Sequence, residues 1–261
     1  MRIAAPQTES VRSLKTFTER HVPISKIKVS AQPAWAWEHY TATVRNLIAH
    51  FSLRVVMEIG GGRFPLFTRE DVDALGIEFA VNDISQRELD LGPEWLHKVC
   101  FDVVGSTVPE SEENRYDLVI SKMVMEHVKD GRQAYRNVHR LLKRGGIFFH
   151  FFPVLYSPPF VANRLLPEAI SRKVLEAAFP GRNDNEFPKF PAHYSCCTIS
   201  PRTEAMLFDT GFREVELVPV YGHDYFRKLP GLRELDSALS DLAYRRGWRR
   251  LASYCYAFGR K

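Results

Sequence analysis

The sequence has little that would indicate a secreted or membrane protein. It contains only four cysteines in 261 residues, without the spacing of a disulfide framework. Cys196 and Cys197 are adjacent and would pair only with strain, so we expect reduced thiols and a cytoplasmic protein. Residues 1–30 hold no apolar core of a signal peptide, and no run reaches the roughly 18 apolar residues of a membrane span. The longest apolar stretch, residues 146–155, contains His150 and Pro153 and fits a buried strand better.

A strong excess of one charge is also lacking. The chain carries 36 basic and 31 acidic residues, for a formal net charge of +5. This balance does not require a nucleic-acid partner. Internal repeats and low-complexity tracts are absent from the sequence as well. With 45% hydrophobic residues the chain can bury a substantial core, as one α/β domain with additions or as two small domains.

Short apolar segments alternate with helical segments along most of the chain. Residues 1–30 show no clear period and are expected to be a loose lead-in. Residues 34–51 have helical spacing, and their apolar face either packs the core or covers a cofactor pocket. Strands are expected at 54–59, 77–82, 98–101, 116–121, 147–152, 212–220 and 253–258, and helices at 130–142, 200–211 and 232–245. The first of these helices is expected to end in Lys143-Arg144-Gly145-Gly146 with a glycine C-cap, and the second to begin with Ser200 as N-cap and Pro201 as first helical residue. The alternation predicts an α/β fold: a doubly wound, mostly parallel seven-stranded sheet with an insertion after the fifth strand.

Three consecutive glycines follow the first strand directly. The strand ends at Glu58-Ile59, and Gly60, Gly61 and Gly62 come next. Residues without a Cβ let a ligand lie against bare backbone. Ligands of parallel sheets bind beyond the carboxyl ends of the strands, where this turn is expected to lie. The turn therefore indicates a nucleotide-like cofactor.

The residues around these glycines bear on which cofactor it is. Asp83 stands 21 residues beyond Gly62, a spacing that suits a ribose contact in a nicotinamide, flavin or related site. A dinucleotide fingerprint needs a glycine where Pro65 stands. The carboxylate of Glu58 would repel a pyrophosphate, but it suits a ligand that carries an ammonium group.

Five motifs in chain order resemble those of the class I S-adenosylmethionine-dependent methyltransferases. They are Glu58-Ile-Gly-Gly-Gly, Val81-Asn-Asp-Ile-Ser, Phe101-Asp-Val, Tyr116-Asp-Leu-Val-Ile-Ser-Lys-Met-Val-Met-Glu-His-Val and Leu141-Leu-Lys-Arg-Gly-Gly. The resemblance covers about residues 50–155 and the terminal strand pair. It implies S-adenosylmethionine as cofactor and methyl transfer by in-line displacement. Such a protein must mainly align nucleophile, methyl group and sulfur, and exclude water.

The resemblance also implies ten cofactor contacts, each at a position that matches a motif. They are Gly60, Gly61 and Gly62 beneath the methionine portion and ribose, Glu58 at the amino group, Asp83 at the ribose hydroxyls, Ile84 and Val103 beside the adenine, Asp102 at the adenine amino group, and Ser121 and Lys122 with main chain near the methionine end. For each acid the alternative is a turn or capping residue.

The sequence departs from the family pattern at two places. Phe64 occupies the position of a third spaced glycine, and Arg63 has no role that the sequence explains. A subset similar to the O-methyltransferases of ubiquinone synthesis holds a divalent metal with Glu-x-x-Glu-His. Here Met123 replaces the first acid and leaves Glu126 and His127. A thioether is a poor ligand for a hard cation, so we expect no metal.

Transfer to a hydroxyl would be helped by a general base. The candidates are His127, His150, His193 and His223, of which the first three are favoured, and each has a structural role as its alternative. A zinc site at His193-x-x-Cys-Cys is not expected, because no second pair of ligands stands at a useful spacing.

The segment 153–200 is expected to choose the substrate. It contains seven prolines, which make long regular elements improbable, and one short helix is expected near residues 168–178. We divide the chain into residues 1–50, a lead-in with a capping helix, and a methyltransferase domain at 51–261 with 153–200 as a substrate-side insertion or lid. Its aromatic residues and those of the preceding strand would suit an aromatic, glycan or lipid-linked acceptor, or would only pack the lid: Phe151, Phe152, Tyr156, Phe160, Phe187, Phe190 and Tyr194.

The sequence thus predicts an S-adenosylmethionine-dependent enzyme that methylates a small molecule or glycan, with oxygen as the favoured acceptor atom. The rivals are a nucleic-acid methyltransferase, a nicotinamide oxidoreductase and a non-catalytic protein with a relic fold. Four arginines around Trp248 are expected to be a solvated helix face, or to meet phosphate or an anionic membrane: Arg245, Arg246, Arg249 and Arg250. The oligomeric state is left open.

Overall fold

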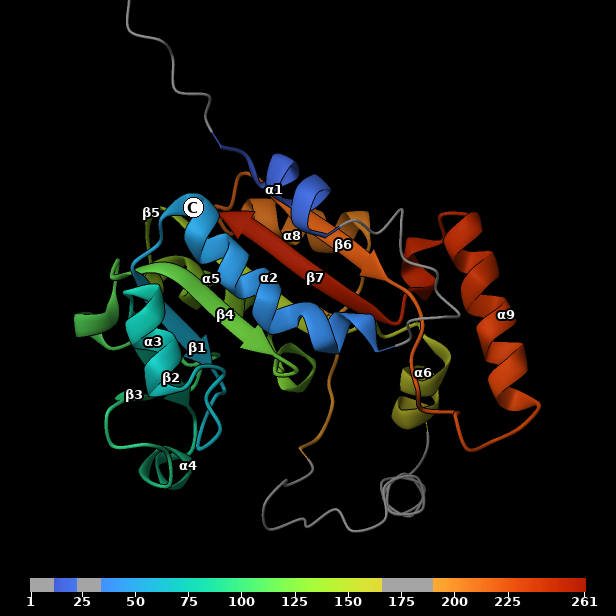
Figure 1. The fold of residues 1–261 in the computed structure, drawn as a ribbon, viewed down its shortest axis with the longest axis horizontal. Coiled ribbons are helices and arrows are strands. Elements are labelled where there is room, and N and C mark those ends of the chain that lie inside the picture. Colours follow the sequence, from blue (N-terminus) through green and yellow to red (C-terminus); the bar gives the residue numbers. More distant parts are fainter. Residues whose placement is uncertain (1–11, 23–33, 166–189) are drawn as a thin grey trace, which may run out of the picture.

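A mixed seven-stranded sheet forms the centre of the molecule (Figure 1). The computed structural model describes residues 12–22, 34–165 and 190–261. The sheet order is β3-β2-β1-β4-β5-β7-β6. The strands are β1 (Val55–Ile59), β2 (Glu78–Asp83), β3 (His97–Cys100), β4 (Tyr116–Lys122), β5 (Leu142–Pro153), β6 (Glu216–Val220) and β7 (Tyr254–Arg260). Strands β1 to β5 are parallel, and β7 runs antiparallel between β5 and β6. The predicted fold class is confirmed, including the insertion that follows β5.

Helices cover both faces of the sheet, as expected for a doubly wound fold. Figure 1 shows α1 (Leu14–His21), α2 (Trp35–Phe51) and α3 (Arg69–Leu75) in front of the strands, and α5 (Gly131–Leu141) and α8 (Pro201–Asp209) behind them. Side chains of β5 alternate between these layers. Phe149 stacks on Tyr40 of α2 with ring centroids 5.1 Å apart, and Phe148 packs against Tyr135 of α5 at 5.2 Å.

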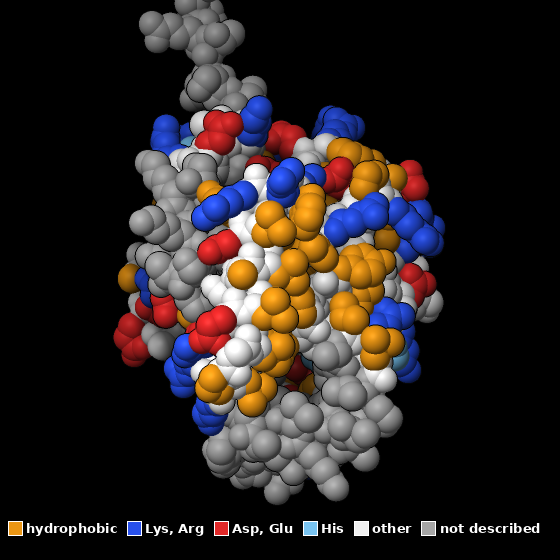
Figure 2. Space-filling view, turned by 90° about the vertical axis from the view of Figure 1, so that its right-hand side faces the viewer, with side chains coloured by type: hydrophobic (Ala, Val, Ile, Leu, Met, Phe, Trp, Pro, Cys, Tyr) orange, Lys and Arg blue, Asp and Glu red, His pale blue; other side chains and the backbone are white. Residues whose placement is uncertain are grey.

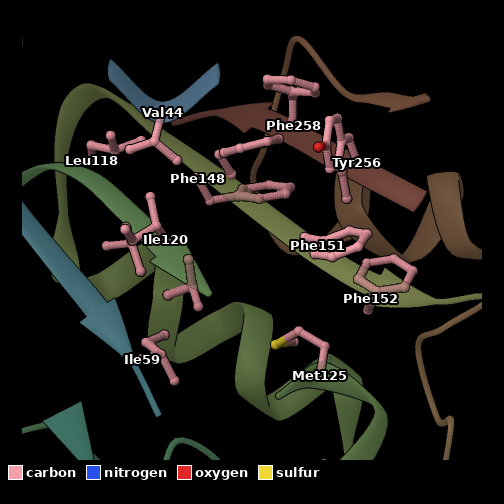
Figure 3. Close-up of a cluster of buried hydrophobic side chains, with 14 of the residues drawn as sticks. Val44, Ile59, Leu118, Ile120, Met125, Phe148, Phe151, Phe152, Tyr256 and Phe258 are labelled. Atoms are coloured by element: carbon pink, nitrogen blue, oxygen red, sulfur yellow. The ribbon is translucent and has the colours of Figure 1, made fainter. Parts of the chain in front are cut away.

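The core is richest in aromatic side chains where β5 lies beside β7. Figure 3 shows the aromatic residues of β5 next to Tyr256 and Phe258 of β7, with Val44 of α2 and Met125 farther out. All of these side chains are fully buried. The run at 147–152, apolar apart from His150, is therefore explained by burial on both faces of β5.

Helix starts follow the capping residues that the sequence offers. Thr68 and Asp71 form a capping box at α3. Asp130 accepts from the N–H of Gln133 at α5, and Ser200 caps α8 with a proline in the first turn, as predicted. The helix α9 (Leu232–Arg245) has the predicted bounds, whereas β6 begins four residues later than expected, at Glu216.

The glycine cap predicted after residue 142 is wrong. Helix α5 ends at Leu141 and β5 begins at Leu142, so Gly145 and Gly146 lie inside the strand. The pairing with β4 shifts by three residues between Tyr116, which pairs with Leu142, and Leu118, which pairs with Ile147, and both glycines lie in this bulged stretch. Sequence alone does not separate a helix cap from a bulge, because both positions favour glycine with positive φ; here φ of Gly145 is +79°.

Two segments that were expected to be irregular contain helices. The described part of the lead-in forms α1, in which Phe17 is fully buried. One buried face of an eight-residue helix is too short to show a period in the sequence. In the insertion, Pro158 and Pro159 begin α6 (Pro158–Leu165), because the first turn of a helix needs no N–H donor. The short helix expected at 168–178, and Phe187, lie outside the described residues.

None of the helices described is both long enough and apolar enough to cross a membrane.

Candidate functional site

The carboxyl ends of four parallel strands lie at one edge of the sheet (Figure 1). Ile59 of β1 pairs with Asn82 of β2 on one side and with Ser121 of β4 on the other. Asp83 pairs with Cys100 at the end of β3. The strand register therefore brings together the positions predicted from four distant segments. Their contact with a cofactor stays a prediction.

The glycine turn is too crowded for side chains. Gly60 and Gly62 have φ values of +71° and +48°. A Cβ on Gly61 would stand 2.8 Å from Cγ1 of Val81. The N–H groups of Gly60 and Gly61 both donate to the carbonyl of Asn82, at 2.8 and 3.2 Å, which holds the turn against β2. Packing and backbone conformation alone therefore favour glycine at these positions.

Glu58 is a buried carboxyl beneath this turn. Its Oε2 accepts a 2.7 Å hydrogen bond from the N–H of Leu66, which closes the segment between them into a loop. Burial raises the pKa of Glu58 to about 7, and the nearby Lys122 and the Leu66 N–H oppose this rise. Glu58 is therefore close to half ionised near neutral pH, and a cation placed beside it would favour the charged form.

An ion pair fastens the far end of the turn. The guanidinium of Arg63 donates to both carboxylate oxygens of Glu88 at 2.6 Å, and these hydrogen bonds hold the pKa of Glu88 below its usual value. Glu88 lies in α4 (Gln86–Asp90), the short helix after β2. No role for Arg63 was visible in the sequence, because its partner is 25 residues away. Phe64, at the position of the third spaced glycine, is 60% exposed, and the guanidinium carbon of Arg63 lies 6.0 Å from its ring centroid.

Asp83 ends β2 with its carboxylate against the glycine turn. Oδ1 accepts from the N–H of Ser85 at 2.8 Å. Oδ2 lies 3.0 Å from where a Cβ on Gly62 would stand, so glycine leaves this oxygen accessible. Burial raises the pKa of Asp83 above its ordinary value. The neighbouring Ile84 is 64% exposed and offers an apolar surface beside the carboxylate.

The turn after β3 is held from two sides. Nδ2 of Asn82 donates to the carbonyls of Val99 and Phe101, at 3.0 and 2.9 Å, and so holds the end of β3 and the first residue after it against β2. Oδ1 of Asp102 accepts from the N–H of Val104 at 2.9 Å. Val103 is buried. Asp102 therefore has the turn-stabilising role named as its alternative, which leaves its second oxygen for a ligand.

The end of β4 is covered by α2. The hydroxyl of Tyr40 donates to the carbonyl of Ser121 at 3.0 Å, so this main-chain acceptor is already engaged. The ammonium of Lys122 lies 4.9 Å from the ring centroid of Trp37 and 5.6 Å from that of Tyr40. Burial lowers the pKa of Lys122, and Glu58 opposes this. The apolar face of α2 thus packs the core and also borders the edge where Glu58 lies.

The three favoured candidate bases occupy different environments. His150 is fully buried between Phe148 and Tyr135, and burial lowers its pKa to about 3. His127 ends the short helix η4 (Met125–His127) after β4; its Nδ1 lies 3.0 Å from the carbonyl of Pro191, so Nδ1 carries the hydrogen. Burial lowers the pKa of His127, which leaves a neutral ring with a lone pair on Nε2. The side chain of His193 is half-buried nearby.

Glu126 joins η4 to the segment after the insertion. Its carbonyl accepts from the N–H groups of His193 and Tyr194, at 2.7 and 2.9 Å. Burial raises the pKa of its carboxyl to about 8. Met123, in the position of the metal-binding acid, has a left-handed backbone with φ of +58°. Over the described ranges, no group of three or more His, Cys, Asp or Glu side chains is arranged to hold a metal ion.

Part of the chain is similar to known methyltransferases. Residues 58–150 match a family model described as a methyltransferase domain. Phosphoethanolamine N-methyltransferase 1 of Triticum aestivum is 35% identical over 89 residues, which are 34% of this chain and 18% of that protein. Phosphoethanolamine N-methyltransferase 3 of Arabidopsis thaliana gives the same identity and the same shares. The match therefore spans less than a fifth of these relatives.

One solved structure shares the fold over nearly the whole chain. It is a putative sarcosine dimethylglycine methyltransferase from Galdieria sulphuraria. The identity is 13%, the match covers 92% of this chain and 90% of that one, and the TM-score is 0.51. This likeness concerns the fold alone.

Proposed function

Since the chain belongs to the class I S-adenosylmethionine-dependent methyltransferases, we propose that it transfers a methyl group from S-adenosylmethionine to a small molecule. The observation that carries the proposal is the edge at β1, β2 and β4. There a glycine turn without room for Cβ atoms lies between the carboxyl groups of Glu58 and Asp83. This combination suits a ligand with an ammonium group at one end and a ribose at the other.

The residues present fit that cofactor. Glu58 would hold the ammonium group, and the accessible oxygen of Asp83 would accept from the ribose hydroxyls. Ile84 and the free oxygen of Asp102 would meet the adenine. When bound, S-adenosylmethionine supplies a methyl group on a positively charged sulfur. The protein's task is then to align the acceptor and to exclude water.

A hydroxyl acceptor would lose its proton to His127. This histidine has a neutral ring at physiological pH, its Nδ1 hydrogen is directed at the Pro191 carbonyl, and its Nε2 can accept. His193 is the second candidate, because its N–H is bound to the carbonyl of the residue before His127. The pKa of about 3 disfavours His150 as a base, and its burial suits a role in packing.

Two acceptor atoms are compatible with the proposed reaction. Oxygen is favoured by the sequence, and a small hydroxylated molecule or glycan is the first candidate. An amine is the second, because the relatives with 35% identity are named N-methyltransferases. Their match to this chain is about as long as the 58–150 family match, which stops before the segment after β5 that we expect to bind the acceptor.

Calorimetric titration with S-adenosylmethionine tests the cofactor site. We expect Asp83→Ala to weaken binding by tenfold or more, because hydrogen bonds to a charged group are worth about 1.5–3 kcal/mol each. Asp73→Ala on α3 is the matched control, since this exposed acid lies outside the site and should leave affinity unchanged. If the Asp83 variant and the natural protein bound S-adenosylmethionine with equal affinity, Asp83 would not be the residue that binds the ribose.

The same measurement separates the rival functions. Binding of NADPH in place of S-adenosylmethionine would indicate an oxidoreductase, and tight salt-dependent binding of DNA or RNA would indicate a nucleic-acid enzyme. Absence of any cofactor binding would indicate a relic fold. Formation of S-adenosylhomocysteine with panels of hydroxyl and amine acceptors would then identify the acceptor atom.

A further inference from the structure

The helix α9 has its apolar residues on the outside. Leu232, Leu235 and Leu242 are 41%, 68% and 42% exposed, and their spacing places them along one side of the helix. We call these three residues the leucine stripe. Figure 2 views the molecule from the side where α9 lies and shows a hydrophobic band there, bordered by Lys and Arg side chains and, along one side, also by Asp and Glu side chains.

The inner side of α9 is polar or small. Asp236, Ser240 and Ala243 are its buried residues. Nε2 of His223 lies 3.2 Å from Oδ2 of Asp236, and the ring of Tyr244 packs edge-on against Tyr221, so residues other than the leucine stripe make the inward contacts of the helix. A helix of a globular protein normally turns its apolar face to the core. The reversed arrangement indicates that the leucine stripe meets something outside the molecule.

The charges around the stripe indicate what that is. Residues 226–250 contain seven basic and three acidic residues. Four of the basic residues are exposed arginines at the carboxyl end of α9 and just beyond it, on either side of the 46% exposed Trp248: Arg245, Arg246, Arg249 and Arg250. Leucines, a tryptophan and arginines on one surface are the residue types of helices that lie in a membrane interface.

We propose that the leucine stripe and these arginines dock the protein on an anionic phospholipid surface. The stripe would enter the boundary between head groups and acyl chains, and Arg245, Arg246 and Arg250 would pair with lipid phosphates. Arg249 is already bound to Glu204 and to the carbonyl of Leu217. A second copy of the chain fits less well, because both copies would bring the same excess of basic residues to the contact. The proposal does not depend on which molecule the enzyme methylates.

Co-sedimentation of the full chain with vesicles tests the docking. We expect the protein to sediment with vesicles of phosphatidylcholine and phosphatidylglycerol, and much less with phosphatidylcholine alone. Leu235→Gln with Leu242→Gln should lower the partition coefficient at least about tenfold, from the lost burial of two leucines. Arg245→Gln with Arg246→Gln should lower it about fivefold for each arginine.

Matched controls come from α4, which lies at the opposite end of the sheet from α9 (Figure 1). Leu91 follows this helix and is 54% exposed, and Arg87 is an exposed residue within it. Leu91→Gln and Arg87→Gln should bind vesicles as the natural protein does. Because the substituted residues are exposed, all variants should keep the same melting temperature. If the leucine variant has a lower melting temperature, its loss of vesicle binding could come from unfolding. The vesicle binding of the arginine variant then tests the proposal.

Two results would overturn the proposal. The first is that the natural protein stays in the supernatant with anionic vesicles, or that the leucine and arginine variants sediment as well as the natural protein does. The other is a dimer mass in light scattering that falls to the monomer mass in Leu235→Gln with Leu242→Gln. That second result would assign the stripe to a contact between two copies of the chain.

Discussion

Replacing Glu58 by glutamine should remove the pH dependence of cofactor binding. Burial raises the pKa of Glu58 to about 7 in the free protein. The neutral form therefore predominates below pH 7, and the carboxylate, which is the form that attracts an ammonium group, appears as the pH rises through 7. The side chain of the Glu58→Gln variant is neutral at every pH, and its amide oxygen can still accept from the N–H of Leu66, so the glycine turn keeps its shape.

The expected size of the effect follows from the ionised fraction. With a pKa of about 7, that fraction rises roughly fifteenfold between pH 5.5 and pH 7, and the association constant should rise in proportion. An α-amino group with a pKa of about 7.7–8.0 stays mostly protonated over this range, so the ligand's own charge is nearly constant. At pH 7 the variant should bind about tenfold more weakly, since a charge-assisted hydrogen bond is worth about 1.5–3 kcal/mol.

Calorimetric titrations at several values of pH would measure both effects. Glu78→Gln is the control: this exposed acid begins β2 at the opposite edge of the sheet and should leave the pH profile unchanged. The reasoning about Glu58 would be refuted if the affinity of the natural protein for S-adenosylmethionine did not change from pH 5.5 to 7. It would also be refuted if the affinity of the glutamine variant rose with pH as steeply as that of the natural protein. Either result would show that Glu58 does not face the ammonium group.

Three further substitutions test the structure around the site. Gly61→Ala should lower stability by about 1–3 kcal/mol in urea unfolding, because its Cβ would stand 2.8 Å from Val81. Arg63→Ala should change the melting temperature little, since a partly exposed ion pair is worth about 1 kcal/mol or less, but freeing the turn from Glu88 should weaken cofactor affinity severalfold by calorimetry. Tyr40→Phe should cost about 1–3 kcal/mol in thermal unfolding, because it leaves a buried β4 carbonyl without its donor.

The sheet could be predicted from the sequence because its signals are local. Runs of apolar residues separated by turn residues indicated all seven strands, with β6 too long by four residues. The errors lie where one residue type serves two structures. Gly145 suited a helix cap and proved to lie in a β-bulge, and Pro158 suited a loop and proved to begin a helix.

The candidate site was predictable only as a set of positions. Parallel strands bring their ends together, so Glu58 and Asp83 were expected at one edge, and the register places them there. The bonds that hold the site were not predictable, because they join residues far apart in the sequence. The pairing of Arg63 with Glu88 and the contact of Tyr40 with the end of β4 are of this kind.

The leucine stripe on α9 also determines how the protein should behave in concentrated solution. At low ionic strength the arginines beside the stripe keep copies of the molecule apart. At about 1 M salt the screening length falls to about 3 Å, so this repulsion is lost while the leucines stay exposed. Salts such as sulfate further strengthen apolar association. Solubility should therefore fall as salt rises, and a mild detergent, by covering the stripe, should restore it.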